Sequence, residues 1–301
     1  MLVVSRDSAL YAVLDRLAAA RRAVFFTGLP GMGKSLMIQQ LAHLASAAGR
    51  RIHLLQWDVA RPVFEASKAG QAYPLVDGIT HVVIRKAVGL WARRAIADWQ
   101  RAYPAPEHLL IGEAPLVGGR LIELARPAAD AAEPVLSAES SSFAIPVPSR
   151  DVRHFLESER ERRAARPGHA REREDAPPDL LRELWRALVT VGCELGVPGT
   201  AAAAAATRLN VTDAHADAGG APPYDPLVYQ RVYERVLARR RVDAIMVDAV
   251  LSTTGSAYDF AIAREELTPS AADAARCIRE VEHRYPDLAR LQRETERWYV
   301  G

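Results

Sequence analysis

Cysteine and lysine are scarce in this sequence, and no long apolar run is present. The two cysteines, Cys193 and Cys277, stand far apart, so neither a disulfide framework nor a zinc-ligand spacing can be built from them. Reduced thiols favour a cytoplasmic location. No stretch approaches the ~20 apolar residues that cross a bilayer. The first residues are interrupted by Arg6 and Asp7 and lack the apolar core of a signal peptide. We therefore expect no membrane partner.

The charge balance does not indicate a nucleic-acid partner. The 301 residues carry a formal net charge of +2, with 49% hydrophobic and 25% charged residues, as in an ordinary soluble globular protein. Only Lys34, Lys68 and Lys86 are lysines among the 39 basic residues. Most arginines are therefore compositional background, and each lysine is of more interest.

Short apolar runs alternate with helical patterns along the chain. We expect five strands, at 23–27, 51–57, 108–113, 143–147 and 242–251. Continuous apolar strands separated by helices are typical of a parallel sheet covered on both faces. The sequence therefore predicts an α/β fold with a parallel five-stranded sheet. Pro146 predicts that the fourth strand ends early or lies at an edge of the sheet.

One glycine-rich segment follows the first predicted strand and precedes a helix. It reads Gly28-Leu-Pro-Gly-Met-Gly-Lys34-Ser35 and fits the phosphate-loop pattern at every fixed position. Glycines let successive N–H groups point inward at a phosphate, and the following helix presents its positive end to the same anion. The lysine of such a loop reaches the β- and γ-phosphates, and the hydroxyl ligates magnesium.

The chain thus resembles the P-loop NTPases, sharply over these eight residues and more loosely over about the first 165. The resemblance implies ATP and Mg²⁺ as cofactors. The residues it assigns to the phosphates are Gly28, Pro30, Gly31, Met32, Gly33, Lys34, Ser35 and Leu36. It assigns the metal to Ser35 and Glu113.

Three branches of these proteins fit poorly. No lysine stands in the guanine-selecting Asn-Lys-x-Asp or Thr-Lys-x-Asp context of GTPases. Leu116-Val-Gly-Gly119 lacks the serine of the ABC signature. The third strand ends Gly112-Glu113, with glycine where motor ATPases have a metal-binding aspartate. This weakens an ATPase interpretation without excluding it.

The layout is similar to that of small-molecule P-loop kinases of the nucleoside, nucleotide and shikimate type. That resemblance implies catalytic roles for Lys34, Asp58, Arg61 and Glu113, with Asp58 at the end of the second strand facing the acceptor hydroxyl. A charged helical lid over 149–166 would supply Arg160 and Arg163. Gly118-Gly119 could offer backbone N–H groups to the acceptor.

Each assignment has an ordinary structural alternative. Asp58 could cap a strand end or pair with Arg61. Arg120 could pair with Glu123 on a solvated helix face. Arg85 and Lys86 could be a surface pair. The glutamates of 149–166 nearly balance its arginines, so a solvated helix fits this segment as well as a lid does.

The predicted organisation is a P-loop core over 1–150, a helical lid or insertion over 151–240, and a last strand with C-terminal helices over 241–301. Residues 251–255 could border the adenine. We expect 166–178 and 198–223 to be mobile. The predicted function is ATP-dependent phosphoryl transfer to a small-molecule acceptor, with a homodimer possible. An ATPase or regulatory switch, and a nucleotide-binding module without turnover, stay open.

Overall fold

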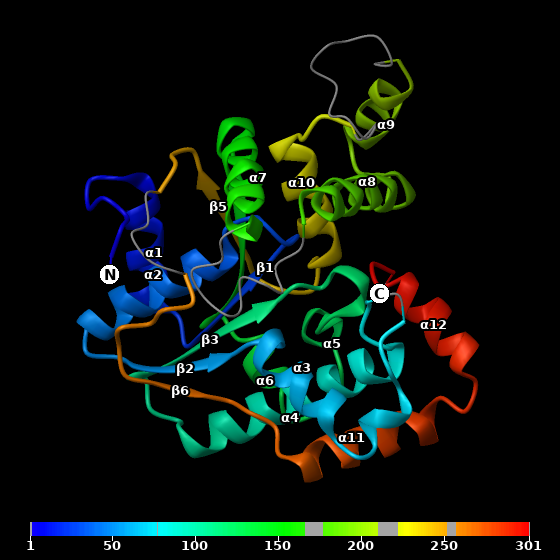
Figure 1. Cartoon of the computed structure of the whole chain (residues 1–301). Helices are drawn as coiled ribbons and strands as arrows, with labels where there is room; N and C mark the ends of the chain where they lie inside the picture. Colours follow the sequence, from blue (N-terminus) through cyan, green and yellow to red (C-terminus); the bar gives the residue numbers. More distant parts are fainter. Residues whose placement is uncertain (1, 77, 166–176, 210–221, 252–256, 301) are drawn as a thin grey trace.

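Six strands form one all-parallel sheet in the computed structural model, which describes residues 2–76, 78–165, 177–209, 222–251 and 257–300. Their order across the sheet is β5-β4-β1-β3-β2-β6 (Figure 1). The strands are β1 (Ala23–Thr27), β2 (Arg51–Leu55), β3 (His108–Ala114), β4 (Ser141–Pro148), β5 (Val242–Val247) and β6 (Arg264–Glu266). The predicted α/β class and parallel sheet are confirmed. The strand count of five is wrong, because β6 pairs with β2 at the edge.

Helices cover both faces of the sheet, because successive strand residues point to opposite sides. Val24 and Phe26 of β1 share a buried cluster with α1 (Ala9–Ala20) and α2 (Lys34–Ala47). Ala23 and Phe25 share the other cluster with the helices of the second face. These include α3 (Trp57–Ala66), α4 (Val82–Ala102), α5 (Ile122–Ala125), α6 (Glu133–Leu136), α8 (Pro178–Glu194), α10 (Pro226–Val236), α11 (Ala271–Arg284) and α12 (Leu288–Glu296).

The fourth strand is internal and runs to Pro148, so the expectation that Pro146 makes it end early or lie at an edge is wrong. β4 pairs with β1 on one side and with β5 on the other. Its last partner in β1 is Phe26, opposite Ala144, so Pro146 lies beyond that pairing and faces a neighbour only in β5. The missing N–H of Pro146 therefore interrupts no ladder with β1.

The chain between β4 and β5 is helical. α7 (Arg150–Ala165), α8, α9 (Thr200–Leu209) and α10 gather at the top of Figure 1. Within 198–223, the residues of α9 are helical, while 210–221 lie outside the described residues, as do 166–176. The expected mobility of 166–178 and 198–223 stays a prediction. The division into a core, an insertion and a C-terminal part stays a prediction.

Two adjacent strands send the chain to opposite faces of the sheet. β1 continues into α2 on one face, whereas β3 continues through a short 3₁₀ turn (Val117–Gly119) into α5 on the other. Such a divergence opens a crevice at the carboxyl ends of the two strands, where ligands bind in open α/β sheets. No helix of the described residues is both long and apolar enough to span a membrane.

Candidate functional site

The phosphate-loop segment lies at this crevice, between β1 and α2. Gly28, Gly31 and Gly33 have φ angles of 139°, 75° and 79°, which residues with a Cβ rarely adopt. Gly33 is the N-cap of α2 and provides no side-chain cap. The first N–H groups of a helix have no partner within the helix, so an anion held by the loop would meet donors there.

Lys34 is the buried cation of the crevice. Its side chain is only 6% exposed; its Nζ donates to the Leu29 carbonyl at 3.0 Å and lies 3.5 Å from Glu113 Oε1. Burial lowers the pKa of Lys34, and the charge of Glu113 opposes that shift. The two predicted site residues from β3 and α2 are therefore brought together. The bond to Leu29 is internal to the loop, and a phosphate oxygen could replace the carbonyl.

Asp58 reaches the same region from a different element than expected. It stands in the first turn of α3 and not at a strand end, because β2 stops at Leu55. An acidic residue is favourable at that helix end. The charge of Asp58 raises the pKa of both Lys34 and Arg120, partly offsetting the lowering by burial. The negative charge of Asp58 therefore acts on both of these cations.

Arg61, assigned to the acceptor, makes an ion pair within its own helix. Its Nη1 lies 3.1 Å from Oε2 of Glu65, and Thr80 donates to the same carboxylate at 3.0 Å. The alternative of a pair between Arg61 and Asp58 stays a prediction.

The helix α7 contacts the loop with some of its arginines. Arg153 is buried, pairs with Glu157 at 2.6 Å and approaches Met32 Sδ at 3.3 Å. Arg160 is half-buried, and its Nε would lie 3.7 Å from a Cβ at Gly31. Arg162 instead is exposed and pairs with Glu159. The Arg163 side chain lies outside the described residues, so the structure places Arg160 alone of the two predicted lid residues.

Two residues from distant helices complete the surroundings of the loop and were missed in the sequence. The hydroxyl of the buried Tyr229, in α10, would lie 2.1 Å from a Cβ at Gly28. Leu181, in α8, would lie 2.9 Å from one at Gly31. Both glycines therefore also permit close packing. Nothing local in the sequence links these side chains to the loop, which they meet only through the tertiary fold.

The loop after β3 also differs from the expected solvated helix. Arg120 and Glu123 do not pair; Glu123 is buried and binds Lys86 Nζ at 2.9 Å. Arg85 is buried, 8% exposed, and its Nη1 donates to the Gly118 carbonyl at 2.5 Å. The interpretation of Arg85 and Lys86 as a surface pair is therefore wrong.

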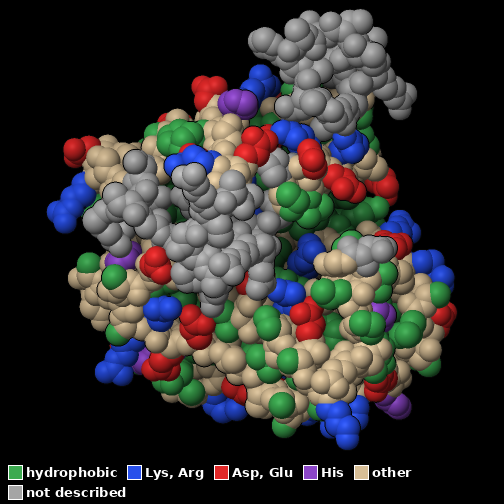
Figure 2. All heavy atoms as spheres, viewed as in Figure 1, with side chains coloured by type: hydrophobic (Ala, Val, Ile, Leu, Met, Phe, Trp, Pro, Cys, Tyr) green, Lys and Arg blue, Asp and Glu red, His purple; other side chains and the backbone are tan. Residues whose placement is uncertain are grey.

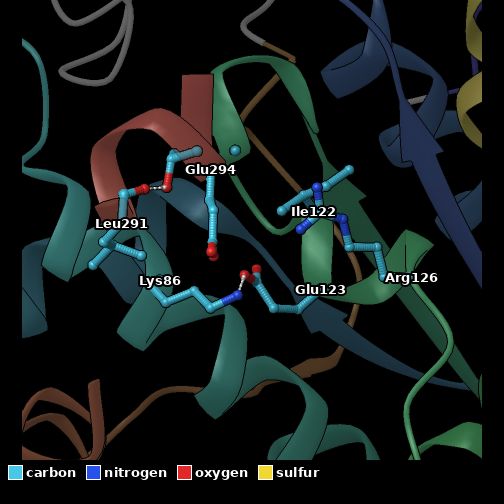
Figure 3. Close-up of a pocket in the computed structure, with 8 residues that line it drawn as sticks. Lys86, Ile122, Glu123, Arg126, Leu291 and Glu294 are labelled. Atoms are coloured by element: carbon cyan, nitrogen blue, oxygen red, sulfur yellow. Dashed lines mark hydrogen bonds and ion pairs between the residues drawn. The ribbon is translucent and has the colours of Figure 1, made fainter. Parts of the chain in front are cut away.

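Lys86 and Glu123 line a cavity of about 10 Å³ between α4, α5 and α12. Figure 3 shows the two side chains pointing toward one another there. That space holds one water at most, so it is not a metabolite site. A larger depression is visible near the centre of the face shown in Figure 2, and basic side chains lie beside it.

Among the described residues, no group of three or more His, Cys, Asp and Glu side chains is arranged to hold a metal by itself. Magnesium at nucleotides is held by one or two protein oxygens together with phosphates and water. Ser35, half-exposed in the first turn of α2, and Glu113 suit that smaller role. Most of residues 251–255, expected near adenine, lie outside the described part.

Comparison of the chain with protein families, with characterised proteins and with solved structures finds no match in any of the three.

Proposed function

We propose that this protein is a P-loop kinase, which transfers a phosphoryl group from Mg-ATP to a small acceptor. The observation that carries the proposal is the loop from Gly28 to Ser35, with its three positive-φ glycines, its uncapped helix and its buried Lys34 facing Glu113. Phosphoryl transfer requires mainly positioning and the stabilisation of spread negative charge. Backbone N–H groups and the ammonium of Lys34 serve that task.

The remaining site residues take roles on either side of the loop. Lys34 would hold the β- and γ-phosphates, and Asp58 would orient the acceptor hydroxyl and accept its proton. Ser35 and Glu113 would hold magnesium, which neutralises phosphate charge when bound. Arg160, above Gly31, would approach the transferred group from the α7 side.

The test is ATP consumption measured against a panel of nucleosides, nucleotides, sugars, hydroxy acids and aminoglycoside-like alcohols. We expect acceptor-dependent turnover that Lys34→Ala abolishes while circular dichroism shows an intact fold. The matched control is Lys68→Ala, since Lys68 is exposed and lies outside the loop. Unchanged turnover in folded Lys34→Ala would remove the phosphate-loop assignment.

ATP hydrolysis coupled to a conformational output is the second candidate. It is favoured by the internal pairing of α7, where Glu157 binds Arg153 and Glu159 binds Arg162. These pairs leave fewer arginines of this helix for the phosphates.

Hydrogen exchange over α7 separates the two functions. A kinase lid should gain protection once ATP and acceptor are both bound, because guanidinium–phosphate pairing is charge-assisted, and closure should suppress hydrolysis. Arg160→Met should lose this protection and Arg162→Met should keep it. Rapid hydrolysis without acceptor, with unchanged exchange in α7, would favour the ATPase.

A further inference from the structure

Four of the five cations of α4 have carboxylate partners, and the fifth, Arg85, does not. Lys86 binds Glu123 at 2.9 Å, Arg93 binds Asp130 at 2.6 Å, Arg94 binds Glu280, and the exposed Arg101 binds Asp98 at 3.1 Å. Arg85 is more buried than Lys86 and Arg94, yet it has no carboxylate within ion-pair distance among the described residues. Its Nη1 binds a carbonyl, and its buried Nε has no partner in that part of the chain.

Arg120 is a second cation without a carboxylate partner among the described residues, and it lies beside Arg85 near Gly118. It is half-buried, and its one described hydrogen bond is a long contact of 3.4 Å to the Val117 carbonyl. A Cβ at Gly118 would lie 3.6 Å from Nη1 of both Arg85 and Arg120. The two guanidinium groups therefore flank one glycine at the carboxyl end of β3.

Carboxylates of the described residues act on these two like charges only from beyond ion-pair distance. Burial, and then the charge of Arg120, lower the pKa of Arg85 to about 10, with Glu296 opposing. Burial also lowers the pKa of Arg120, with Asp58 opposing and Arg61 adding to the effect. Removing a cation from water without pairing it is unfavourable, so this arrangement calls for an anion.

We infer that Arg85 and Arg120 form an anion-binding site for the acceptor, which therefore carries a carboxylate or a phosphate beside its reacting hydroxyl. The inference rests on the proposed function, which places that hydroxyl at Asp58. Planar guanidinium groups bind both anions through paired hydrogen bonds. Asp58, in the first turn of α3, and Arg120 follow the carboxyl ends of the neighbouring strands β2 and β3, so one small molecule could place its anion at the arginines and its hydroxyl at the carboxylate.

The experiment measures thermal unfolding of the full chain with inorganic phosphate or succinate. Succinamide is the neutral analogue, and sodium chloride sets the ionic strength of the baseline. A Lys34→Ala background prevents the phosphate loop from capturing the probe. At about 100 times its Kd, an anion should raise Tm by about 5 °C. Arg85→Gln and Arg120→Gln should abolish the rise, and succinamide should cause none.

Arg101→Gln is the matched control, because Arg101 lies on the same helix, is exposed and pairs with Asp98. It should keep the full rise in Tm. Arg120→Gln should also leave Tm without anion unchanged or higher, since it removes an unpaired charge; this keeps the test readable if Arg85→Gln folds poorly. The larger response, to phosphate or to succinate, identifies the anion of the acceptor.

No rise above the salt baseline, or an equal rise in the arginine variants, would overturn the inference. A separate titration of the wild-type chain with MgADP tests the proposed function. Absence of MgADP binding would remove the kinase, while an arginine-dependent response to anions would still support the site.

Discussion

Gly28 is the position where one added methyl group should most directly disturb the loop. Its φ is +139°, and a Cβ there would lie 2.1 Å from the Tyr229 hydroxyl and 3.4 Å from its Cζ. The backbone conformation costs a non-glycine residue about 1–3 kcal/mol, and overpacking adds about 1–3 kcal/mol. Gly28→Ala should therefore lower the free energy of unfolding by about 2–6 kcal/mol, measured by urea denaturation.

Two further variants separate these costs. Gly49→Ala, at φ +81° with no atom within 4 Å of the new Cβ, should cost only the backbone term of about 1–2 kcal/mol. Tyr229→Phe removes the oxygen that a Cβ at position 28 would meet. The double variant Gly28→Ala with Tyr229→Phe should therefore lose about 1–3 kcal/mol less in free energy of unfolding than the sum of the two single losses. Equal costs at Gly28 and Gly49, together with an additive double variant, would refute the contact between loop and tyrosine.

Three other predictions concern the acceptor side, α7 and the response to acid. Asp58→Asn should lower turnover about 10²–10⁴-fold while the Kd of ATP changes little; near-normal turnover would leave Asp58 as a helix-end residue. Arg153→Met should lower the free energy of unfolding by about 1–3 kcal/mol in urea denaturation, because it leaves the partly buried carboxylate of Glu157 unpaired, whereas Arg162→Met, at an exposed position, should be indistinguishable from wild type. The hydrogen bond from Arg240, then a second from Arg93, lower the pKa of Glu133 to about 2 against the effect of burial. A carboxyl group whose pKa is lower in the folded than in the unfolded state stabilises the fold fully above the unfolded pKa of 4.5, and this stabilisation is lost as the pH falls toward 2. Glu133→Gln should therefore make the free energy of unfolding depend less on pH between about 4.5 and 2. An unchanged dependence on pH in this range would contradict the prediction.

The sequence carries strong signals for the central strands and weak ones for the edge. β1 and β3 are short apolar runs, and the glycine pattern locates the loop between β1 and α2. β6 has only three residues, Arg-Glu-Glu, and pairs with β2 through its backbone. A polar edge strand has no apolar pattern to reveal it, and charges at an edge discourage further pairing.

The site divides in the same way between local and tertiary information. Lys34 could be predicted from the glycine pattern after β1, and Glu113 from its place at the end of the apolar run of β3. The helical position of Asp58 was not predicted, since the apolar run continues through Trp57 after β2 has ended. The pairing of Lys86 with Glu123, which leaves Arg85 without a carboxylate, depends on how α4 packs against α5. No spacing along one helix specifies such partners.

The loop after β3 combines two unfavourable features that a bound acceptor would offset. Leu116 and Leu121 have φ angles of 62° and 58°, and the Val117 N–H closes a tight turn onto the Pro115 carbonyl at 2.8 Å. Strained residues cost about 1–3 kcal/mol each and persist where the surroundings impose them. This loop carries Arg120 and meets Arg85 of α4, and neither arginine has a carboxylate partner at ion-pair distance among the described residues. Backbone strain and unpaired guanidinium groups are each unfavourable for the folded state. Their occurrence together, at the carboxyl edge between two diverging strands, supports the anion-binding site inferred above.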